Sequence, residues 1–287
     1  MKKLLKKFLK KILKAKENET VSDAFNRLKY SFLKKINRTK FDTNDLHQAL
    51  ISLGLNKGDT VIVQCAWRAF IGYTGTPKDV INCIKNIVGV NGTILMPAYT
   101  SNSELFKFND TTNAGYLAEY FRENYAEFRS LDTKFSMCAS GYNAESLTKD
   151  HINSYYCFDE NSPYYKAIKV NAKILLLGLG KYPHKVTLFH CVTYKLRNTV
   201  KCYKDVYTFK KSVYLYDKIG KLYKKELVDR QPRYQNNKYK FALLFNKLVA
   251  KKCYFRLNKL DIYLFDSLEL FESAKKYIVD NNYNLYK

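Results

Sequence analysis

Two side chains that can take part in proton transfer lie three positions apart in the stretch Thr187-Leu188-Phe189-His190. A histidine can accept a proton near neutral pH, because its unperturbed pKa is ~6.5. We therefore expect His190 to be the chemical centre of the protein. The alternative interpretation is a core histidine whose ring is satisfied by backbone groups.

The element that must position this pair is the apolar run 173–177, which stops at Gly178-Leu179-Gly180. A short apolar run that ends at glycine is typical of a buried central strand followed by a tight turn. Ligands in open α/β sheets bind beyond the carboxyl ends of the strands. The loop that leads to His190 is expected at that edge of the sheet.

Strands and helices alternate along the rest of the chain, which predicts parallel neighbours in an α/β sheet. The polar segment 101–113 lacks periodicity and is expected to be a mobile loop near the site. Residues 42–287 are expected to form one domain after a basic extension, residues 1–41. The patterns predict helices at 20–40, 42–50, 77–88, 114–126, 143–152 and 267–280, strands at 60–64, 93–96, 137–141, 254–256 and 261–265, and a hairpin built from 213–216 and 222–226.

Composition narrows the class of protein. The seven cysteines include no Cys-x-x-Cys pair, which favours free thiols in a reducing cytosol over disulfides or a metal site. No stretch approaches the ~20 apolar residues that span a bilayer, and no signal peptide is evident, so a cytoplasmic protein is expected. The net charge of +24 favours polyanionic partners, although an AT-rich genome also raises lysine content. No nucleic-acid-binding motif accompanies the charge, and no nucleic-acid partner is expected.

Residues 1–16 contain eight lysines, and their apolar residues Leu5, Phe8, Leu9, Ile12 and Leu13 fall on one helical face. This pattern is typical of a basic amphipathic helix that lies in the interface of an anionic membrane. It predicts peripheral attachment to the inner face of the cytoplasmic membrane. A helix packed on the protein's own surface and a disordered tail are the two alternatives.

The order of short motifs over residues 42–280 resembles the aminoglycoside 3-N-acetyltransferase family, which transfers an acyl group from coenzyme A to a sugar amine. The motifs are Leu53-Gly54 with Gly58-Asp59, Val88-Gly89 with Gly92-Thr93, Met96-Pro97, Phe135-Ser136-Met137 with Gly141, Asn161-Ser162-Pro163, Leu175-Leu176-Leu177-Gly178, Thr187-Leu188-Phe189-His190 and the closing stretch 261–266.

The resemblance implies a three-layer α/β/α fold with a mixed, largely parallel central sheet, and acetyl-CoA as the acyl donor without a metal. It implies that His190 helps to deprotonate the acceptor amine, which must lose a proton before it can attack a thioester. Thr187 or backbone N–H groups would stabilise the oxyanion. The candidate contacts to the co-substrate are Cys65, Ala66, Trp67, Arg68, Ser136 and Ser162.

The chain departs from the family pattern at two places. The family usually has a glutamate three residues after this histidine, where this chain has Thr193. The loop after the first strand usually reads His-Ser-Ser, where this chain has Gln64-Cys65-Ala66. His190 therefore needs another carboxylate to orient it, and the candidates are Asp132, Asp159 and Glu160.

The charge guides the choice of acceptor. Aminoglycosides are polycations, which a protein at +24 would repel, whereas coenzyme A and nucleotide-linked amino sugars carry phosphates that it would attract. Arg68 and Lys166 are candidate phosphate contacts. We expect an N-acyltransferase that acts on an amino sugar, nucleotide-linked or glycan-bound, in bacterial surface polysaccharide biosynthesis.

Three alternatives stay open. One is an aminoglycoside-modifying resistance enzyme. Another uses Cys65 as a nucleophile that His190 activates, because Cys–His pairs are common in covalent catalysis. The last is a membrane-recruited, non-catalytic member of a glycan assembly complex.

Overall fold

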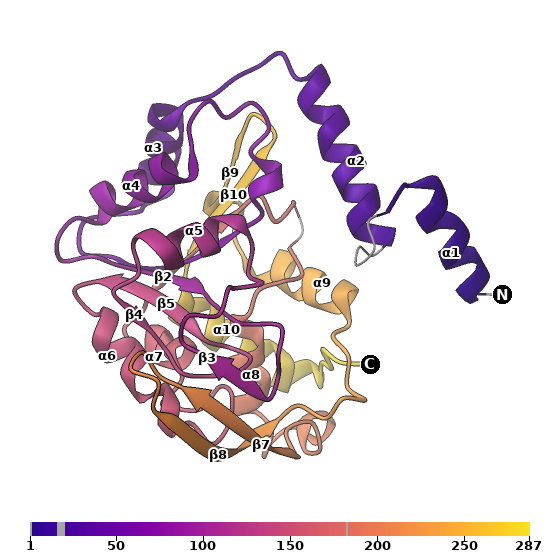
Figure 1. Cartoon of the computed structure of the whole chain (residues 1–287), viewed down its shortest axis with the longest axis vertical. Helices are drawn as coiled ribbons and strands as arrows, with labels where there is room; N and C mark the ends of the chain where they lie inside the picture. The colour runs from indigo at the N-terminus through magenta and orange to yellow at the C-terminus, as the bar shows by residue number, and fades with distance from the viewer. Residues whose placement is uncertain (1, 16–20, 182) are drawn as a thin grey trace.

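The structure is a computed structural model that describes residues 2–15, 21–181 and 183–287. Its main sheet runs in the order β4-β5-β2-β1-β6-β10-β9 (Figure 1). The strands of this sheet are β1 (Thr60–Cys65), β2 (Thr93–Pro97), β4 (Phe128–Arg129), β5 (Met137–Gly141), β6 (Lys173–Leu177), β9 (Tyr254–Leu257) and β10 (Leu260–Asp266). The expected strands at 60–64, 93–96, 137–141, 173–177, 254–256 and 261–265 are confirmed.

Parallel pairing is confined to the centre of this sheet. Strand β1 pairs in parallel with β2 on one side and with β6 on the other. Beyond them, β5 and β10 run antiparallel to their neighbours, and β4 and β9 are antiparallel again. The expected mixed sheet is confirmed, but fewer of its pairs are parallel than the alternation of strands and helices suggested, because both flanks return as antiparallel strands.

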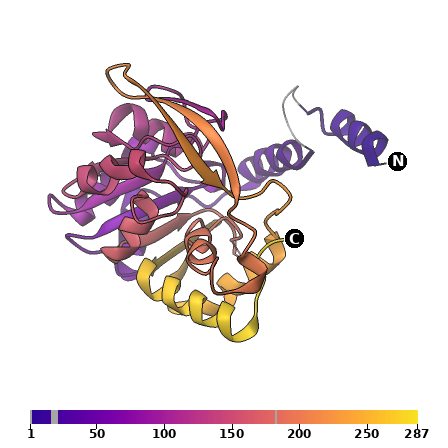
Figure 2. The same cartoon turned by 90° about the horizontal axis from the view of Figure 1, so that it is seen from below.

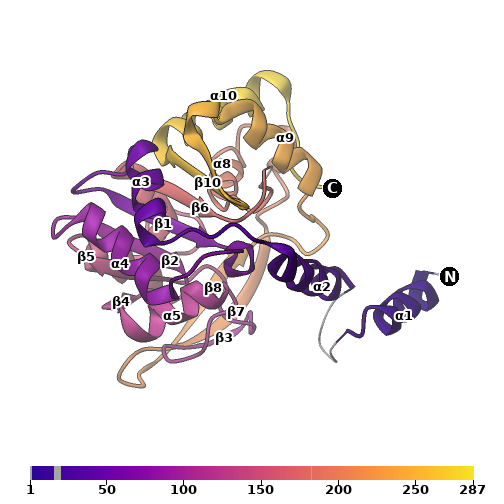
Figure 3. The same cartoon turned by 90° about the horizontal axis from the view of Figure 1, so that it is seen from above.

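Alternating side chains of the central strands build a core on each face of the sheet. Val61 and Val63 pack with helices α3 (Thr43–Ser52), α4 (Pro77–Val88) and α5 (Tyr116–Asn124). Ile62 points the other way, into a second core. Helices that contribute to this second core are α6 (Ala144–Thr148), α7 (Pro163–Lys169), α8 (Leu188–Lys195), α9 (Lys238–Leu248) and α10 (Ser267–Asn281). Figures 2 and 3 show the resulting three layers, which confirm the predicted α/β/α architecture.

A smaller sheet, ordered β3-β7-β8, lies against the second core. The predicted hairpin is confirmed as β7 (Phe209–Tyr216) and β8 (Leu222–Asp229). The segment 101–113, expected as a mobile loop, contains one short strand: β3 (Leu105–Lys107) pairs with β7, and Phe106 is fully buried. A three-residue strand is too short to show periodicity in a polar segment.

Helix boundaries follow the sequence pattern closely for α2 (Val21–Ile36), α4 and α10, whereas α7, α8 and α9 were not predicted. Short 3-10 turns complete the chain at η1 (Trp67–Ala69), η2 (Lys149–Asn153), η3 (Lys201–Tyr203) and η4 (Lys251–Cys253). Helix α1 (Lys2–Ile12) and helix α2 project from the body (Figures 1 and 3). Among the helices that the structure describes, none is long and apolar enough to cross a membrane.

Candidate active site

The first turn of α8 lies at the carboxyl edge of the central strands, as the sequence predicted for His190. Gln64, the penultimate residue of β1, donates from Nε2 to Thr187 Oγ1 at 3.1 Å and to the carbonyl of Lys185 at 3.2 Å. The backbone N–H of His190 in turn donates to the carbonyl of Thr187 at 2.9 Å. Thr187 and His190 therefore lie one turn apart, beside the end of β1.

The imidazole of His190 is held by a tyrosine hydroxyl instead of a carboxylate. Its Nδ1 lies 3.2 Å from the hydroxyl oxygen of Tyr286, and the two rings are nearly parallel, with an interplanar angle of 4°. Tyr286 is fixed because the backbone of segment 285–287 pairs with segment 235–237. A residue nearly a hundred positions away thus orients the imidazole.

Thr193, where the resemblance implies a glutamate, joins the same group of hydroxyls. Its Oγ1 lies 2.8 Å from the Tyr286 hydroxyl and 2.7 Å from the Tyr207 hydroxyl, and the two tyrosine hydroxyls are 3.0 Å apart. Thr193 and Tyr207 both also donate to the carbonyl of His190, each at 3.1 Å. We call Thr193, Tyr207 and Tyr286 the hydroxyl cluster; all three side chains are buried.

The hydroxyl cluster is compatible with the tautomer of His190 that a general base needs. Thr193 and Tyr207 both donate to the carbonyl of His190, and the proton of Tyr286 can go to Thr193, to Tyr207 or to Nδ1 of His190. When it goes to Thr193 or Tyr207, the oxygen of Tyr286 accepts from the Nδ1–H of His190, and Nε2 keeps a lone pair.

Apolar surroundings and nearby cations keep His190 neutral. Its ring centroid lies 5.7 Å from that of Phe158 and 5.4 Å from that of Phe241. Burial, followed by the positive charges of Arg230 and Lys134, lowers the pKa of His190 to about 3. The imidazole is therefore unprotonated at pH 7, and the same low pKa makes it a weak base in the ligand-free protein.

A polar groove of about 470 Å³ shares charged residues with the surroundings of His190. Its basic lining residues are Lys134, Lys211, Arg230 and Lys238, and its acidic lining residues are Glu104 and Asp229. The guanidinium carbon of Arg230 lies 5.1 Å from the centroid of the Tyr286 ring, which links the wall of the groove to the hydroxyl cluster.

One carboxylate in the groove organises its lysines. Asp229 Oδ2 accepts from Lys134 Nζ at 2.7 Å and from Lys211 Nζ at 3.3 Å. These lysines keep the pKa of the Asp229 carboxyl below its usual value despite its burial. With Glu104 and Asp229 counted against the four basic residues, the lining keeps a net positive charge.

None of the three candidate carboxylates hydrogen-bonds to His190 within residues 2–15, 21–181 and 183–287. Asp132 is buried, accepts from the backbone N–H groups of residues 134 and 135, and has its Oδ2 3.9 Å from Nε2 of His151. Asp159 accepts from Ser154 and from the N–H groups of 155, 156 and 161, which fixes a turn. Glu160 is exposed and lies 3.4 Å from Lys195 Nζ. The structure therefore corrects the expectation of an orienting carboxylate.

The candidate co-substrate residues 65–68 lie at the turn after β1, next to Gln64. Cys65 ends the strand, and burial raises the pKa of its thiol, so the thiol stays protonated near neutral pH. The indole of Trp67 stacks on Phe70 with a centroid distance of 4.7 Å. Ala66 precedes η1, and Arg68 is exposed on it. This turn and the first turn of α8 are neighbours through the Gln64–Thr187 contact.

The two candidate serines have structural hydrogen bonds instead. Ser136 Oγ donates to the carbonyl of Ser130 at 2.6 Å. Ser162 caps α7, accepting from the N–H of Tyr165 and donating to the carbonyl of Asp159. Lys166, a candidate phosphate contact, forms an ion pair with Asp150. The side chains of these three residues are thus engaged within the protein.

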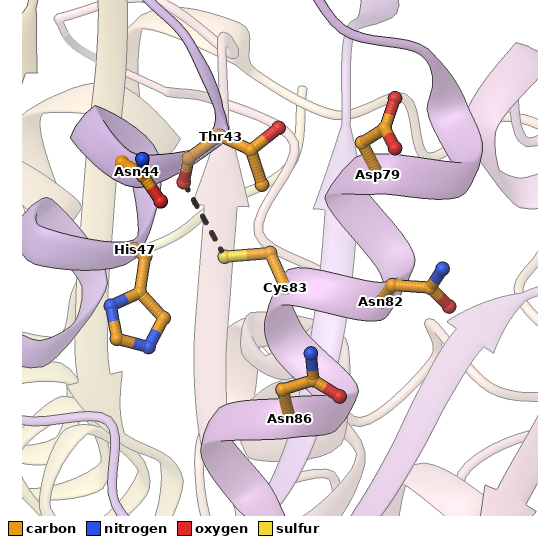
Figure 4. Close-up of a pocket in the computed structure, with 7 residues that line it drawn as sticks. All are labelled: Thr43, Asn44, His47, Asp79, Asn82, Cys83 and Asn86. Carbon is orange, nitrogen blue, oxygen red and sulfur yellow. Dashed lines mark hydrogen bonds between the residues drawn. The ribbon is translucent and has the colours of Figure 1, made fainter.

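Sequence reasoning missed Tyr286, Tyr207 and the lining of the groove. The chain has 25 tyrosines, and no local pattern distinguishes these two from the others. A second small pocket, of about 230 Å³, lies between α3 and α4 (Figure 4). Its Asp79 carboxylate caps α4 at Thr76, and its Cys83 thiol faces the carbonyl of Thr43. In the described part of the chain, no three His, Cys, Asp or Glu side chains gather as a metal site would require.

Several solved structures share the fold. An aminoglycoside acetyltransferase AAC(3)-IVa apoenzyme aligns with a TM-score of 0.68 and 20% identity over 85% of this chain and 90% of that chain. AAC-IIIb, solved as a binary complex with CoASH, aligns with a TM-score of 0.69 and 19% identity over 84% of this chain and 97% of that chain. YokD from Bacillus subtilis aligns with a TM-score of 0.66 and 22% identity over 83% of this chain and 99% of that chain. These similarities establish the α/β/α fold.

Curated sequences and a family profile complete the comparison. Aminoglycoside N(3)-acetyltransferase VII of Streptomyces paromomycinus is 27% identical over 161 residues, which cover 46% of this chain and 54% of that protein. Aminoglycoside N(3)-acetyltransferase III of a Salmonella species is 25% identical over 156 residues, 46% of this chain and 53% of that protein. The chain thus spans about half the length of the curated relatives it matches. Residues 62–279 match the family described as aminoglycoside 3-N-acetyltransferase, and the chain belongs to that family.

Proposed function

We propose that this protein transfers the acetyl group of acetyl-CoA to the amine of an amino sugar, with His190 as the general base. The observation that carries the proposal is the 3.2 Å contact between Nδ1 of His190 and the Tyr286 hydroxyl: when the Nδ1–H donates to Tyr286, Nε2 is the proton acceptor. Family membership supports acetyl-CoA as the donor, and AAC-IIIb was solved with CoASH.

The proposed step is direct transfer in a ternary complex. Nε2 of His190 takes a proton from the acceptor amine as its nitrogen attacks the thioester carbonyl carbon. The carbon–sulfur bond then breaks, and the imidazolium returns the proton to the sulfur of CoA. The Thr187 hydroxyl accepts from Gln64, and its own proton can turn from the neighbouring Tyr164 hydroxyl to the oxyanion.

A covalent route through Cys65 receives no support from the site. Its thiol is kept protonated by burial, and the imidazole of His190 faces Tyr286, Phe158 and Phe241. A cysteine nucleophile needs a lowered pKa or an adjacent base. Direct transfer is therefore the mechanism we propose.

The charge of the groove supports an anionic acceptor, such as a nucleotide-linked amino sugar in surface polysaccharide biosynthesis. Four basic side chains line it against two acidic ones. A negative charge bound there would offset Arg230 and Lys134, whose positive charges depress the pKa of His190. Such an acceptor would therefore raise the basicity of His190 at the moment it binds.

An aminoglycoside is the second candidate acceptor. The curated relatives carry the name aminoglycoside N(3)-acetyltransferase, and a relative of the same fold was solved in complex with a gentamicin. A polycation would add to the positive charge of the groove instead of offsetting it, which is the physical argument against this acceptor.

The deciding assay is release of free CoA thiol from acetyl-CoA, measured with a panel of nucleotide-linked amino sugars and, in parallel, with aminoglycosides. Turnover with the nucleotide sugars supports the first candidate, and turnover with aminoglycosides alone supports the second. The absence of thiol release with both groups, from protein that is shown to be folded, overturns the proposal and favours a non-catalytic partner in a glycan assembly complex.

A matched pair of histidine variants tests the base. His190→Asn should lower kcat by about 10²–10⁴-fold, the usual contribution of a general base, while acetyl-CoA still binds. His47→Asn, in the pocket between α3 and α4, is the control and should leave kcat unchanged. Equal activity of His190→Asn and the wild type would exclude His190 as the base.

A further inference from the structure

Helix α2 carries a row of large apolar side chains that the fold does not cover. Phe25, Leu28, Phe32 and Ile36 are 57%, 42%, 61% and 51% exposed. Their spacing places them on one face of the helix. A soluble domain seldom leaves a continuous apolar stripe of this length in water, so the stripe indicates an interaction surface.

Helix α1 also carries exposed apolar side chains, and its sequence is richer in lysine than that of α2. Leu4, Leu5, Phe8 and Ile12 are 74%, 58%, 60% and 59% exposed. The sequence expectation of a helix packed on the protein's own surface is therefore not met, because these side chains remain uncovered. Their exposure leaves the apolar face of α1 available to a partner outside the chain.

Hydrogen bonds join the two helices. The guanidinium of Arg27 on α2 donates to the carbonyl of Lys14 at 2.8 Å and to that of Leu13 at 3.4 Å, at the end of α1. Tyr30 of α2 packs against the core that Val61 and Val63 of β1 also join. Figures 1 and 3 show both helices extending from one side of the body. We call residues 2–15 and 21–36 the helical arm.

The charge around the arm identifies its partner. Residues 1–40 contain fourteen lysines and arginines and only three acidic residues. An anionic lipid headgroup layer attracts such a cluster, and the acyl region beneath it takes up apolar side chains to a depth of roughly 5–10 Å. A second copy of this chain would bring like charges together, which disfavours it as the occupant.

We propose that the helical arm docks on an anionic bilayer surface through the apolar stripes of both α1 and α2. The bilayer covers Phe8 and Phe32 while the lysines meet the headgroups, and the catalytic domain stays in water. The proposal goes beyond the acetyl-transfer reaction and does not depend on it, because vesicle binding is measured without substrate.

The test is co-sedimentation of the full chain with vesicles of phosphatidylcholine and phosphatidylglycerol in a three-to-one ratio, and with phosphatidylcholine alone. We expect binding to the mixed vesicles that falls as salt screens the charges, and little binding to the neutral ones. Phe8→Ser combined with Phe32→Ser should lower the partition coefficient by at least about tenfold.

Matched controls distinguish binding through the helical arm from nonspecific adsorption of the protein to vesicles. Ile219→Ser removes a residue that is 86% exposed at the β7–β8 turn, and it should leave binding unchanged. Lys7→Gln with Lys11→Gln should weaken binding, whereas Lys218→Gln with Lys252→Gln should have little effect.

Three results would overturn the proposal. The first is an absence of binding to the mixed vesicles. The second is equal binding by the Phe8→Ser, Phe32→Ser variant and the wild type. The third is a dimer that forms without lipid and disappears in that variant, which would show that a second copy covers the stripes.

Discussion

Removal of the Tyr286 hydroxyl is the sharpest test of how the site holds its base. In Tyr286→Phe the ring stays, but Nδ1 of His190 loses its partner at 3.2 Å, and Thr193 and Tyr207 lose contacts at 2.8 and 3.0 Å. The imidazole can then rotate or adopt the tautomer with its proton on Nε2, which cannot act as a base. The expected defect is therefore in the proton transfer itself.

The magnitude follows from one lost orienting hydrogen bond. A neutral hydrogen bond contributes about 1 kcal/mol net, and a buried group left unsatisfied costs roughly 1–3 kcal/mol. We expect kcat to fall by about tenfold, which corresponds to ~1.4 kcal/mol, while KM for acetyl-CoA changes by less than about twofold. Steady-state thiol release with the best acceptor measures both quantities.

A matched variant separates positioning from stability. Tyr283→Phe removes a hydroxyl that donates to the carbonyl of Lys240 at 3.1 Å in the same C-terminal segment, so it should affect stability but not kcat. Nitrogen NMR of His190 adds a readout independent of turnover: the Nδ1–H tautomer should dominate in the wild type and decline in Tyr286→Phe. Wild-type kcat and an unchanged tautomer in folded Tyr286→Phe would refute the role assigned to Tyr286.

Two further predictions concern the stability of the folded domain. Gly178 has a φ of +73°, and a Cβ there would lie 2.5 Å from Cβ of Ala69, so Gly178→Ala should lower the free energy of unfolding by roughly 3 kcal/mol in urea titrations. Gly220→Ala, with φ +82° but open space, should cost only about 1 kcal/mol, and equal losses would contradict the steric argument. Burial lowers the pKa of His151 to about 4. Between pH ~6.5 and 4 the unfolded chain therefore binds a proton at His151, whereas the folded protein does not. The free energy of unfolding should therefore decline by up to about 3 kcal/mol between pH 6.5 and 4, and His151→Asn should flatten that decline; an identical slope in wild type and variant would exclude His151 as its source.

The sheet was predictable because its residues obey local rules. Apolar runs bounded by glycine or proline marked β1, β2 and β6, and buried strands of this kind need no information from the rest of the chain. The antiparallel flanks were not predictable as such, since the direction of β5 depends on the path of 98–136 and not on its own sequence. Helix α8 was missed because its sides are almost wholly buried, which removes the amphipathic period.

In the site, too, the residues that follow local rules were predictable and those that depend on distant segments were not. His190 and Thr187 stand out as residue types near the end of a strand, and their placement beside Gln64 agrees with the sequence expectation. The partner of His190 could not be found locally, because Tyr286 lies 96 residues away and reaches the imidazole only through the pairing of segments 235–237 and 285–287. The carboxylates that the sequence offered as partners, such as Asp132, are instead taken up by turns and by His151.

The threonine at position 193 and the basic groove both bear on one property, the pKa of His190. A glutamate at this position would place a negative charge in the hydroxyl cluster, next to His190, and would oppose the positive field that Arg230 and Lys134 exert on the imidazole. With Thr193 the hydrogen-bond partner of the imidazole is uncharged, so burial, followed by the positive charges of Arg230 and Lys134, keeps the pKa of His190 low. An anionic ligand in the groove would offset the contribution of Arg230 and Lys134 but not that of burial, and would thereby restore part of the basicity of His190. On this reasoning the replacement of the glutamate ties catalysis to the charge of the acceptor, which is why the proposed acceptor is anionic.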